Sequence, residues 1–209
     1  MEVYGEKPKR FTQKWWENYF YYYKIHTIVG ICVLLVGGYL IYSDATATKY
    51  DLQIDYISEL GSMTLQTDML ADIAEGHIDD VTGNEVCDAF VMLLDMAPSQ
   101  DMQYAQAMQV KYMTEVGYSE GFVFIVTEKY KSELAESGVF ENAADWSGTD
   151  VDGEFISLAG CKVLAELGMP DDQLYVAVRK LRDKENDKEK KIAEHENGIK
   201  FAKFLINER

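Results

Sequence analysis

The chain has 209 residues, of which 36 are acidic and 20 are basic, so its net charge at neutral pH is −16. So large an acidic excess, with no basic patch along the chain, excludes nucleic acid as a partner, because phosphates would be repelled. The sequence also holds only three cysteines, which form no visible disulfide framework.

The first distinctive stretch joins an aromatic cluster to an apolar run. Seven of the nine residues from Trp15 to Tyr23 are aromatic, and residues 25–42 contain no Lys, Arg, Asp or Glu. A helix of about 20 mostly apolar residues crosses a bilayer, and rings with a polar atom favour its interfaces. We therefore predict a transmembrane helix over residues 25–42 in contact with the lipid bilayer. Its predicted interface residues are Trp15, Trp16, Tyr19, Phe20, Tyr22, Tyr23 and Lys24 on the near side and Tyr39 and Tyr42 on the far side.

The charges on either side of this run predict its direction. Five basic and three acidic residues precede Ile25, net +2, whereas the residues after Tyr42 carry −18. Lys and Arg next to a membrane segment stay on the cytoplasmic side. We predict a single-pass protein of the cell membrane, with residues 1–24 as a cytoplasmic aromatic and basic head. Residues 43–49 then form a linker, and residues 50–209 form an extracytoplasmic domain.

Two features of this part leave alternatives open. Ala45-Thr46-Ala47 has the small-x-small pattern of a signal-peptide cleavage site, although the long apolar run and the aromatic head favour an anchor. A lipoprotein is excluded, because Ile31 stands before Cys32 where a small residue is needed. Outside the membrane, Cys87 and Cys161 either form a disulfide or are two buried small hydrophobic residues.

The residues after the linker alternate between strand and helix patterns. Strands are predicted at residues 51–57, 85–94, 121–127, 154–160 and 173–181. Helices are predicted at residues 63–75, 98–116, 128–137 and 161–167 and at the end of the chain, with a loop over 145–153. This alternation predicts an α/β fold, a single domain with a mostly parallel sheet and helices on both faces. In the second helix, the residues expected to face the core are Met102, Ala105, Met108, Tyr112, Met113 and Val116.

The order of these elements resembles one lobe of the type II extracytoplasmic solute-binding proteins. The similar stretches are YAQAMQVKYMTEVGYSEGFVFIVTEKYKSELAESGVF, QLYVAVRK and NGIKFAKFLIN, the last being similar to the closing helix of that class. The resemblance implies a single periplasmic-binding-like lobe, because residues 138–173 are too few for a second one. No ligand residue is carried over. The entry YYKIHTIVG is similar to that of short membrane-anchored proteins of clostridial-type Gram-positive bacteria.

Patterns that support catalysis or metal binding are weak. His77 and His195 lie in polar stretches and are expected at the surface, and no G-x-S-x-G elbow supplies a nucleophile. Asp150-Val151-Asp152-Gly153 departs from an EF-hand loop at its first and twelfth positions. A looser calcium site would use Asp145, Asp150, Asp152 and Glu154, but a solvated acidic loop is the expectation. We predict no catalytic residue, metal or cofactor.

These observations favour a non-catalytic accessory, tether or sensor at the cell envelope that binds another envelope protein or an exported peptide. The alternative is a receptor for a small solute, with a pocket at the carboxyl ends of the strands. A third possibility, a hydrolytic enzyme, lacks a recognisable group of catalytic residues.

Overall fold

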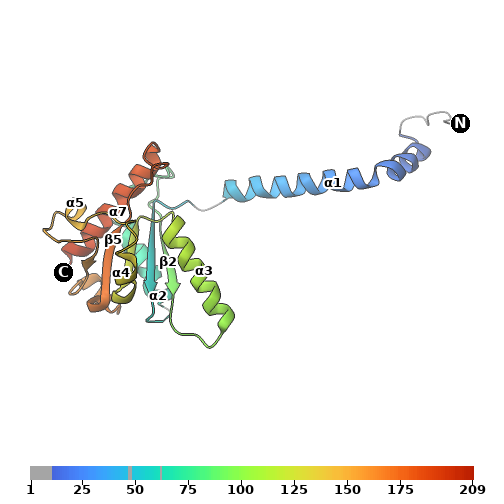
Figure 1. Cartoon of the computed structure of the whole chain (residues 1–209). Coiled ribbons are helices and arrows are strands. Elements are labelled where there is room, and N and C mark those ends of the chain that lie inside the picture. Colours follow the sequence, from blue (N-terminus) through green and yellow to red (C-terminus); the bar gives the residue numbers. More distant parts are fainter. Residues whose placement is uncertain (1–10, 47–48, 62) are drawn as a thin grey trace. The chain divides into compact units, whose positions relative to one another are not determined.

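The structure is a computed structural model that describes residues 11–46, 49–61 and 63–209, and it contains two compact units. The first unit, Met1–Thr48, contains one long helix, α1, which runs without interruption over Gln13–Thr46 (Figure 1). The aromatic cluster and the apolar run therefore belong to the same helix, which extends beyond the predicted residues 25–42 at both ends. Within it, Tyr19–Ser43 is long and apolar enough to cross a membrane.

The second unit, Lys49–Arg209, is an α/β domain with one open, mixed sheet of five strands in the order β2-β1-β3-β5-β4. The strands are β1 (Leu52–Ser58), β2 (Ala89–Asp95), β3 (Val123–Thr127), β4 (Ile156–Ser157) and β5 (Leu174–Val178). The helices are α2 (Thr64–Glu75), α3 (Met102–Tyr118), α4 (Glu128–Leu134), α5 (Ala143–Ser147), α6 (Lys162–Glu166) and α7 (Glu189–Asn207), with a 3₁₀ turn at Asp171–Gln173.

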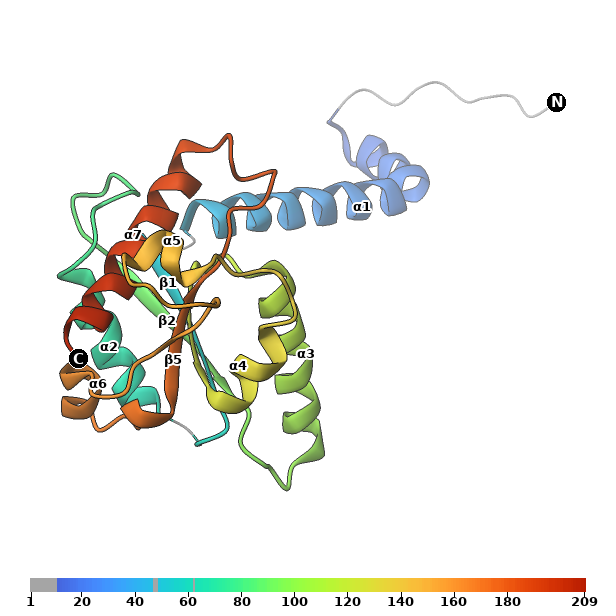
Figure 2. The same cartoon turned by 60° about the vertical axis from the view of Figure 1, so that its left-hand side comes forward.

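Helices cover both faces of this sheet, as predicted. Figure 2 shows α2, α6 and α7 on one side and α3 and α4 on the other. On the first side Leu52, Ile54 and Tyr56 of β1 pack with Phe201 and Leu205 of α7. On the second side the residues that form the core are Ile57, Leu94, Tyr112, Phe124, Val126, Tyr130, Leu134, Phe140, Phe155 and Ala177. Because successive side chains of a strand point to opposite faces, the central strands are apolar on both sides.

The prediction of a mostly parallel sheet is not confirmed. β1 pairs in parallel with β2 and with β3, but β5 runs antiparallel to both β3 and β4. A parallel pair needs a crossover that returns the chain to the same end of the sheet, and α2 and α3 supply it for the first three strands. After β3 the chain passes through α4 and α5, of 7 and 5 residues, to β4, which runs in the same direction as β3. It then passes through α6, of 5 residues, to β5, which enters the sheet from the opposite end.

Three local predictions differ from the structure. The predicted loop over residues 145–153 begins inside a short helix, α5, because Asn142 accepts a hydrogen bond from the Ala144 amide and caps it. The strand predicted from residue 85 begins at Ala89, after a loop in which Glu85 has a positive φ of 66°. In α3, Met102 and Met113 are exposed and Tyr112 is the buried residue, because α3 packs mainly through the side that carries Tyr112.

Close packing of α7 on the sheet leads to a first testable prediction. A Cβ at Gly198 would lie 3.1 Å from Cβ of Phe122 and 3.2 Å from Cγ2 of Val123. Although alanine favours a helix over glycine, overpacking of this contact is expected to lower the free energy of unfolding of Gly198→Ala by about 1–3 kcal/mol. Urea unfolding of the full chain in detergent measures the effect.

A matched control lies in another helix. At Gly117 of α3 a Cβ meets nothing within 4 Å, so Gly117→Ala is expected to gain about 0.5–1 kcal/mol from helix propensity alone. A Gly198→Ala variant that is as stable as Gly117→Ala would show that α7 can move away from β3 at no cost.

Candidate functional site

The predicted interface residues lie along α1 in two groups. Near its start, rings four residues apart stack on one another: Trp15 on Tyr19 with centroids 5.5 Å apart, and Tyr19 on Tyr23 at 5.4 Å. Trp16 stacks in the same way on Phe20 at 5.8 Å. Tyr22, Tyr39 and Tyr42 are exposed by 66–69%.

The spacing of the two groups matches a bilayer. The 19 residue-to-residue steps from Tyr23 to Tyr42 correspond to ~29 Å at the helical rise of about 1.5 Å per residue, close to the ~30 Å of hydrocarbon thickness. The apolar side chains between them are exposed, and none of the apolar window is buried within the described residues. By length and composition this helix can serve as a membrane anchor or as a signal sequence.

In the α/β domain, buried charges gather where β1 and β3 begin and β5 ends. Arg179, which follows β5, is 2% exposed and lies over the ring of Phe122, 4.3 Å from its centroid. Its Nη1 forms an ion pair of 2.9 Å with Oε2 of Glu185, and its Nε donates to the carbonyl of Gly121 at 2.9 Å. Arg182 also contacts Glu185, at 3.2 Å. The burial of Glu185 would raise its pKa, but hydrogen bonds from Arg179 and Arg182 outweigh this and lower the pKa to about 2.

A second carboxylate, Asp55 of β1, is fully buried beside this ion pair. It accepts hydrogen bonds from the hydroxyl of Ser119 and from Nε2 of Gln53, the latter at 2.9 Å. Burial raises the pKa of Asp55 to about 6, and the hydrogen bonds from Ser119 and Gln53 oppose that increase. The backbone of Gly121 comes so near that a Cβ there would lie 2.8 Å from Oδ2 of Asp55. No sequence motif points to this cluster.

The two histidines of the domain have different surroundings. His77 is exposed, as predicted, and stacks on Phe204 with centroids 3.6 Å apart. The prediction that His195 lies at the surface is wrong, because it faces the sheet from α7 and is only 7% exposed. Its ring meets Phe122 edge-on at 5.3 Å. Its Nε2 lies 3.0 Å from Oε1 of Glu141 but is not oriented for a hydrogen bond to it.

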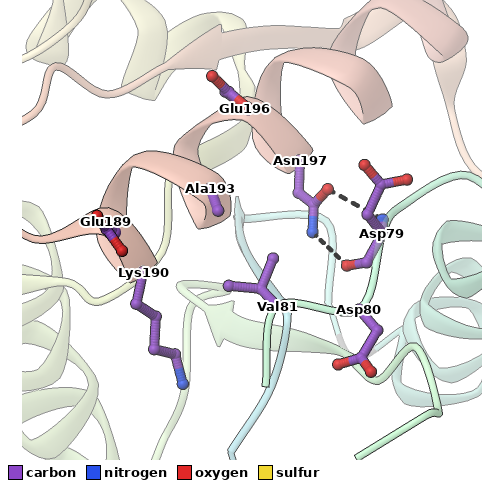
Figure 3. A pocket seen from close by; sticks show the side chains of 8 residues that line it. All are labelled: Asp79, Asp80, Val81, Glu189, Lys190, Ala193, Glu196 and Asn197. Atoms are coloured by element: carbon purple, nitrogen blue, oxygen red, sulfur yellow. Dashed lines mark hydrogen bonds between the residues drawn. The ribbon is translucent and has the colours of Figure 1, made fainter. Parts of the chain in front are cut away.

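A cavity of about 490 Å³ lies between α7 and the loop that follows α2 (Figure 3). Its lining residues are Asp79, Asp80, Val81, Glu189, Lys190, Ala193, Glu196 and Asn197. Asn197, 1% exposed, holds the loop by accepting from the Asp79 amide at 3.0 Å and donating to the Asp79 carbonyl at 2.8 Å. Asp51 accepts from the amides of Val81 and Thr82 at 2.7 Å each, so this loop sits at the start of β1.

This cavity therefore opens at the amino ends of the parallel strands. The pocket predicted for a solute receptor would lie at their carboxyl ends, where the Thr127 hydroxyl donates to the carboxylate of Glu59. Four carboxylates and one ammonium line the cavity, so its charge suits a cationic group better than an anion.

The acidic loop around residues 145–153 forms no metal site among the described residues. Across the described parts of the chain, no three His, Cys, Asp or Glu side chains are placed to hold a metal ion, and the looser calcium set of Asp145, Asp150, Asp152 and Glu154 falls within those parts. The three cysteines are free: Cys32 is exposed, Cys87 is half-buried and Cys161 lies in the core. In the structure, the two cysteines of the domain are thus small packed side chains rather than a disulfide.

Comparison with known proteins adds no relative to this description. No family model matches the chain, and neither a curated protein nor a solved structure matches it. The function is therefore inferred from the residues and their geometry.

Proposed function

We propose that this chain is a single-pass membrane protein whose α/β domain lies outside the cell and acts there by binding a protein or peptide. The observation that carries the proposal is the separation into two units, an exposed apolar helix and a compact acidic domain. The aromatic groups near both ends of α1 support an anchor over a cleaved signal. A helix that stays in the bilayer has two membrane–water interfaces that aromatic rings favour, whereas a signal peptide is removed. The net charge of +2 before Ile25 supports an inward N-terminus.

The anchor is tested by placing charge in the middle of the apolar helix. Val33→Arg combined with Leu35→Arg introduces two arginines at exposed positions, each of which costs about 2.5–3.5 kcal/mol at the centre of a membrane helix. The wild-type chain is expected to stay with membranes after a carbonate wash, and the double variant is expected to leave them. Val33→Ile with Leu35→Ile is the matched control. A wild-type chain that is released by carbonate, or whose domain resists protease added to intact cells, contradicts the proposal.

Binding is tested on the same cells. A photoreactive phenylalanine analogue at Leu65, Val86 or Tyr118, all more than half exposed, reports what touches the domain in place. Adducts with an envelope protein or an exported peptide are expected, and they should disappear in the two-arginine variant. If none of the positions gives an adduct, the binding function is wrong.

The cavity beside α7 favours a second candidate function, a receptor for a small cationic solute. Thermal unfolding of the full chain in detergent, with basic amino acids and polyamines, separates the two. A solute that raises the unfolding midpoint in the wild type but not in Glu196→Gln supports the receptor.

A further inference from the structure

β2 is the outermost strand of the sheet, and one side of its backbone is free. Among the residues that the structure describes, it pairs with β1 alone. The amide of Met96 donates to Ser58 and the carbonyl of Asp88 accepts from Asp51, so the even-numbered residues direct their backbone groups toward β1. Backbone groups alternate in direction along a strand. The odd-numbered residues Val91 and Leu93 therefore direct an amide and a carbonyl away from the sheet, and within the described residues these groups have no partner.

This edge lacks the features that usually keep edge strands apart. Such strands carry lysine, proline or a bulge, or are very short. Residues 89–94 read AFVMLL and contain neither a charge nor a proline, and the pairing with β1 runs in unbroken register over seven residues. The opposite edge of the sheet, β4, has only two residues. Phe90, Met92 and Leu93 are half-buried, so they offer apolar contact to a neighbouring chain.

The charges around β2 indicate what such a neighbour carries. Glu75 of α2 reaches the first amide of the strand, with its Oε1 3.4 Å from the Ala89 nitrogen. Asp88 precedes the strand and Asp95 ends it. Residues 49–209 contain 32 acidic and 15 basic residues, net −17, so two copies of this domain repel each other. A basic extended chain is attracted to both ends of the same strand.

We propose that the free edge of β2 binds an extended peptide that adds to the sheet as a further strand. The peptide has apolar residues in its middle and lysine or arginine at its ends. Main-chain hydrogen bonds to Val91 and Leu93 hold it, as in other strand-addition complexes, and the carboxylates at the strand ends pair with its basic residues. This inference rests on the proposed binding function and names its surface and its ligand.

The test uses the full chain in nanodiscs of zwitterionic lipid. The probe is a synthetic peptide of alternating valine and threonine with two lysines at each end. A second peptide carries N-methyl groups on the amides of one edge, which removes those donors without changing charge or side chains. We expect the first peptide to bind and to slow amide hydrogen exchange at Val91 and Leu93, and we expect the methylated peptide to bind at least about tenfold more weakly.

Two variants at one position separate the backbone from the side chain. Leu93→Pro removes the outward amide but leaves the hydrogen bonds to β1, because the Leu93 amide does not point toward that strand. It is expected to weaken binding about tenfold or more, whereas Leu93→Ala, which keeps the amide, should stay within about threefold of the wild type. Thermal unfolding of both variants checks that they fold, and the methylated peptide gives the same answer on the unchanged protein.

Several results would overturn the inference. They are the absence of peptide binding, equal binding of both peptides, or protection from exchange that falls on α7 and the cavity instead of β2. Dimers that form without peptide and are broken by Leu93→Pro would assign the edge to a second copy of the chain. If photo-crosslinking in cells finds the same partners for Leu93→Pro as for the wild type, the binding function stands. In that case only its assignment to the edge of β2 is wrong.

Discussion

Replacing Arg179 with alanine is expected to lower the free energy of unfolding of the α/β domain by about 3–5 kcal/mol, because it leaves the buried carboxylate of Glu185 without its main partner. Arg179 is 2% exposed and the Glu185 side chain 9%. The change also removes the donor to the Gly121 carbonyl and the cation that lies over Phe122. Urea unfolding of the full chain in detergent, followed by near-ultraviolet circular dichroism, measures the loss.

The neighbouring Arg182→Ala is the matched control. Its side chain is 37% exposed and contacts the same carboxylate at 3.2 Å, so solvent replaces part of the interaction. A cost nearer ~1 kcal/mol is expected there. Equal losses in the two variants, or a loss below about 1 kcal/mol in Arg179→Ala, would show that the burial of this ion pair has no energetic consequence.

The second large effect is a pH dependence that Asp55 introduces. Its pKa in the folded domain is about 6, against 3.8 in the unfolded chain, so between these values the folded state binds the extra proton. The free energy of unfolding must then fall as pH rises from about 4 to 6, by roughly 3 kcal/mol for a pKa shift of this size. Asp55→Asn, which cannot ionise, is expected to remove this fall and to be the more stable protein at pH 8.

Urea unfolding of the wild type and of Asp55→Asn at a series of pH values measures the difference between their free energies of unfolding. This difference should vanish at pH 4. Asp80→Asn is the contrasting control. Hydrogen bonds from the backbone, that of Gly83 first, lower the pKa of Asp80, so its carboxylate stabilises the fold above its unfolded pKa and that variant should be less stable at pH 8. If Asp55→Asn shows the wild-type pH dependence, burial leaves the pKa of this carboxyl the same in the folded protein as in the unfolded chain.

The sequence predicted best the parts that depend on local patterns. The membrane-length helix follows from the apolar run over residues 25–42 next to the aromatic cluster, and all five strands follow from short apolar runs between turns. It predicted less well where a distant segment decides the outcome. Whether β5 runs parallel or antiparallel to β3 depends on which end of the sheet the chain returns to. The residues of the two strands do not determine this.

The buried polar residues could not be predicted from local patterns either. Apolar and polar residues alternate over residues 51–57, which suggests a strand with one solvent-exposed face. In the structure α3 and α4 cover that face, and Asp55 has no exposed surface. His195 lies in a charged stretch, but the helical repeat places it on the same side as the buried Ala202, seven residues later. Polar residues on a covered face look like surface residues until the covering element is known.

The contact between β1 and α7 has a consequence for biogenesis. The Asn197 side chain donates to the Asp51 carbonyl, and Phe201 and Leu205 complete the core around Leu52, so the first strand of the domain is closed by a helix from the other end of the sequence. A nascent chain that still lacks those residues leaves β1 uncovered on one face and cannot settle into its native packing. Stable packing of the domain would thus wait until the whole stretch from β1 to α7 has been synthesised, and earlier intermediates would expose the apolar face of β1.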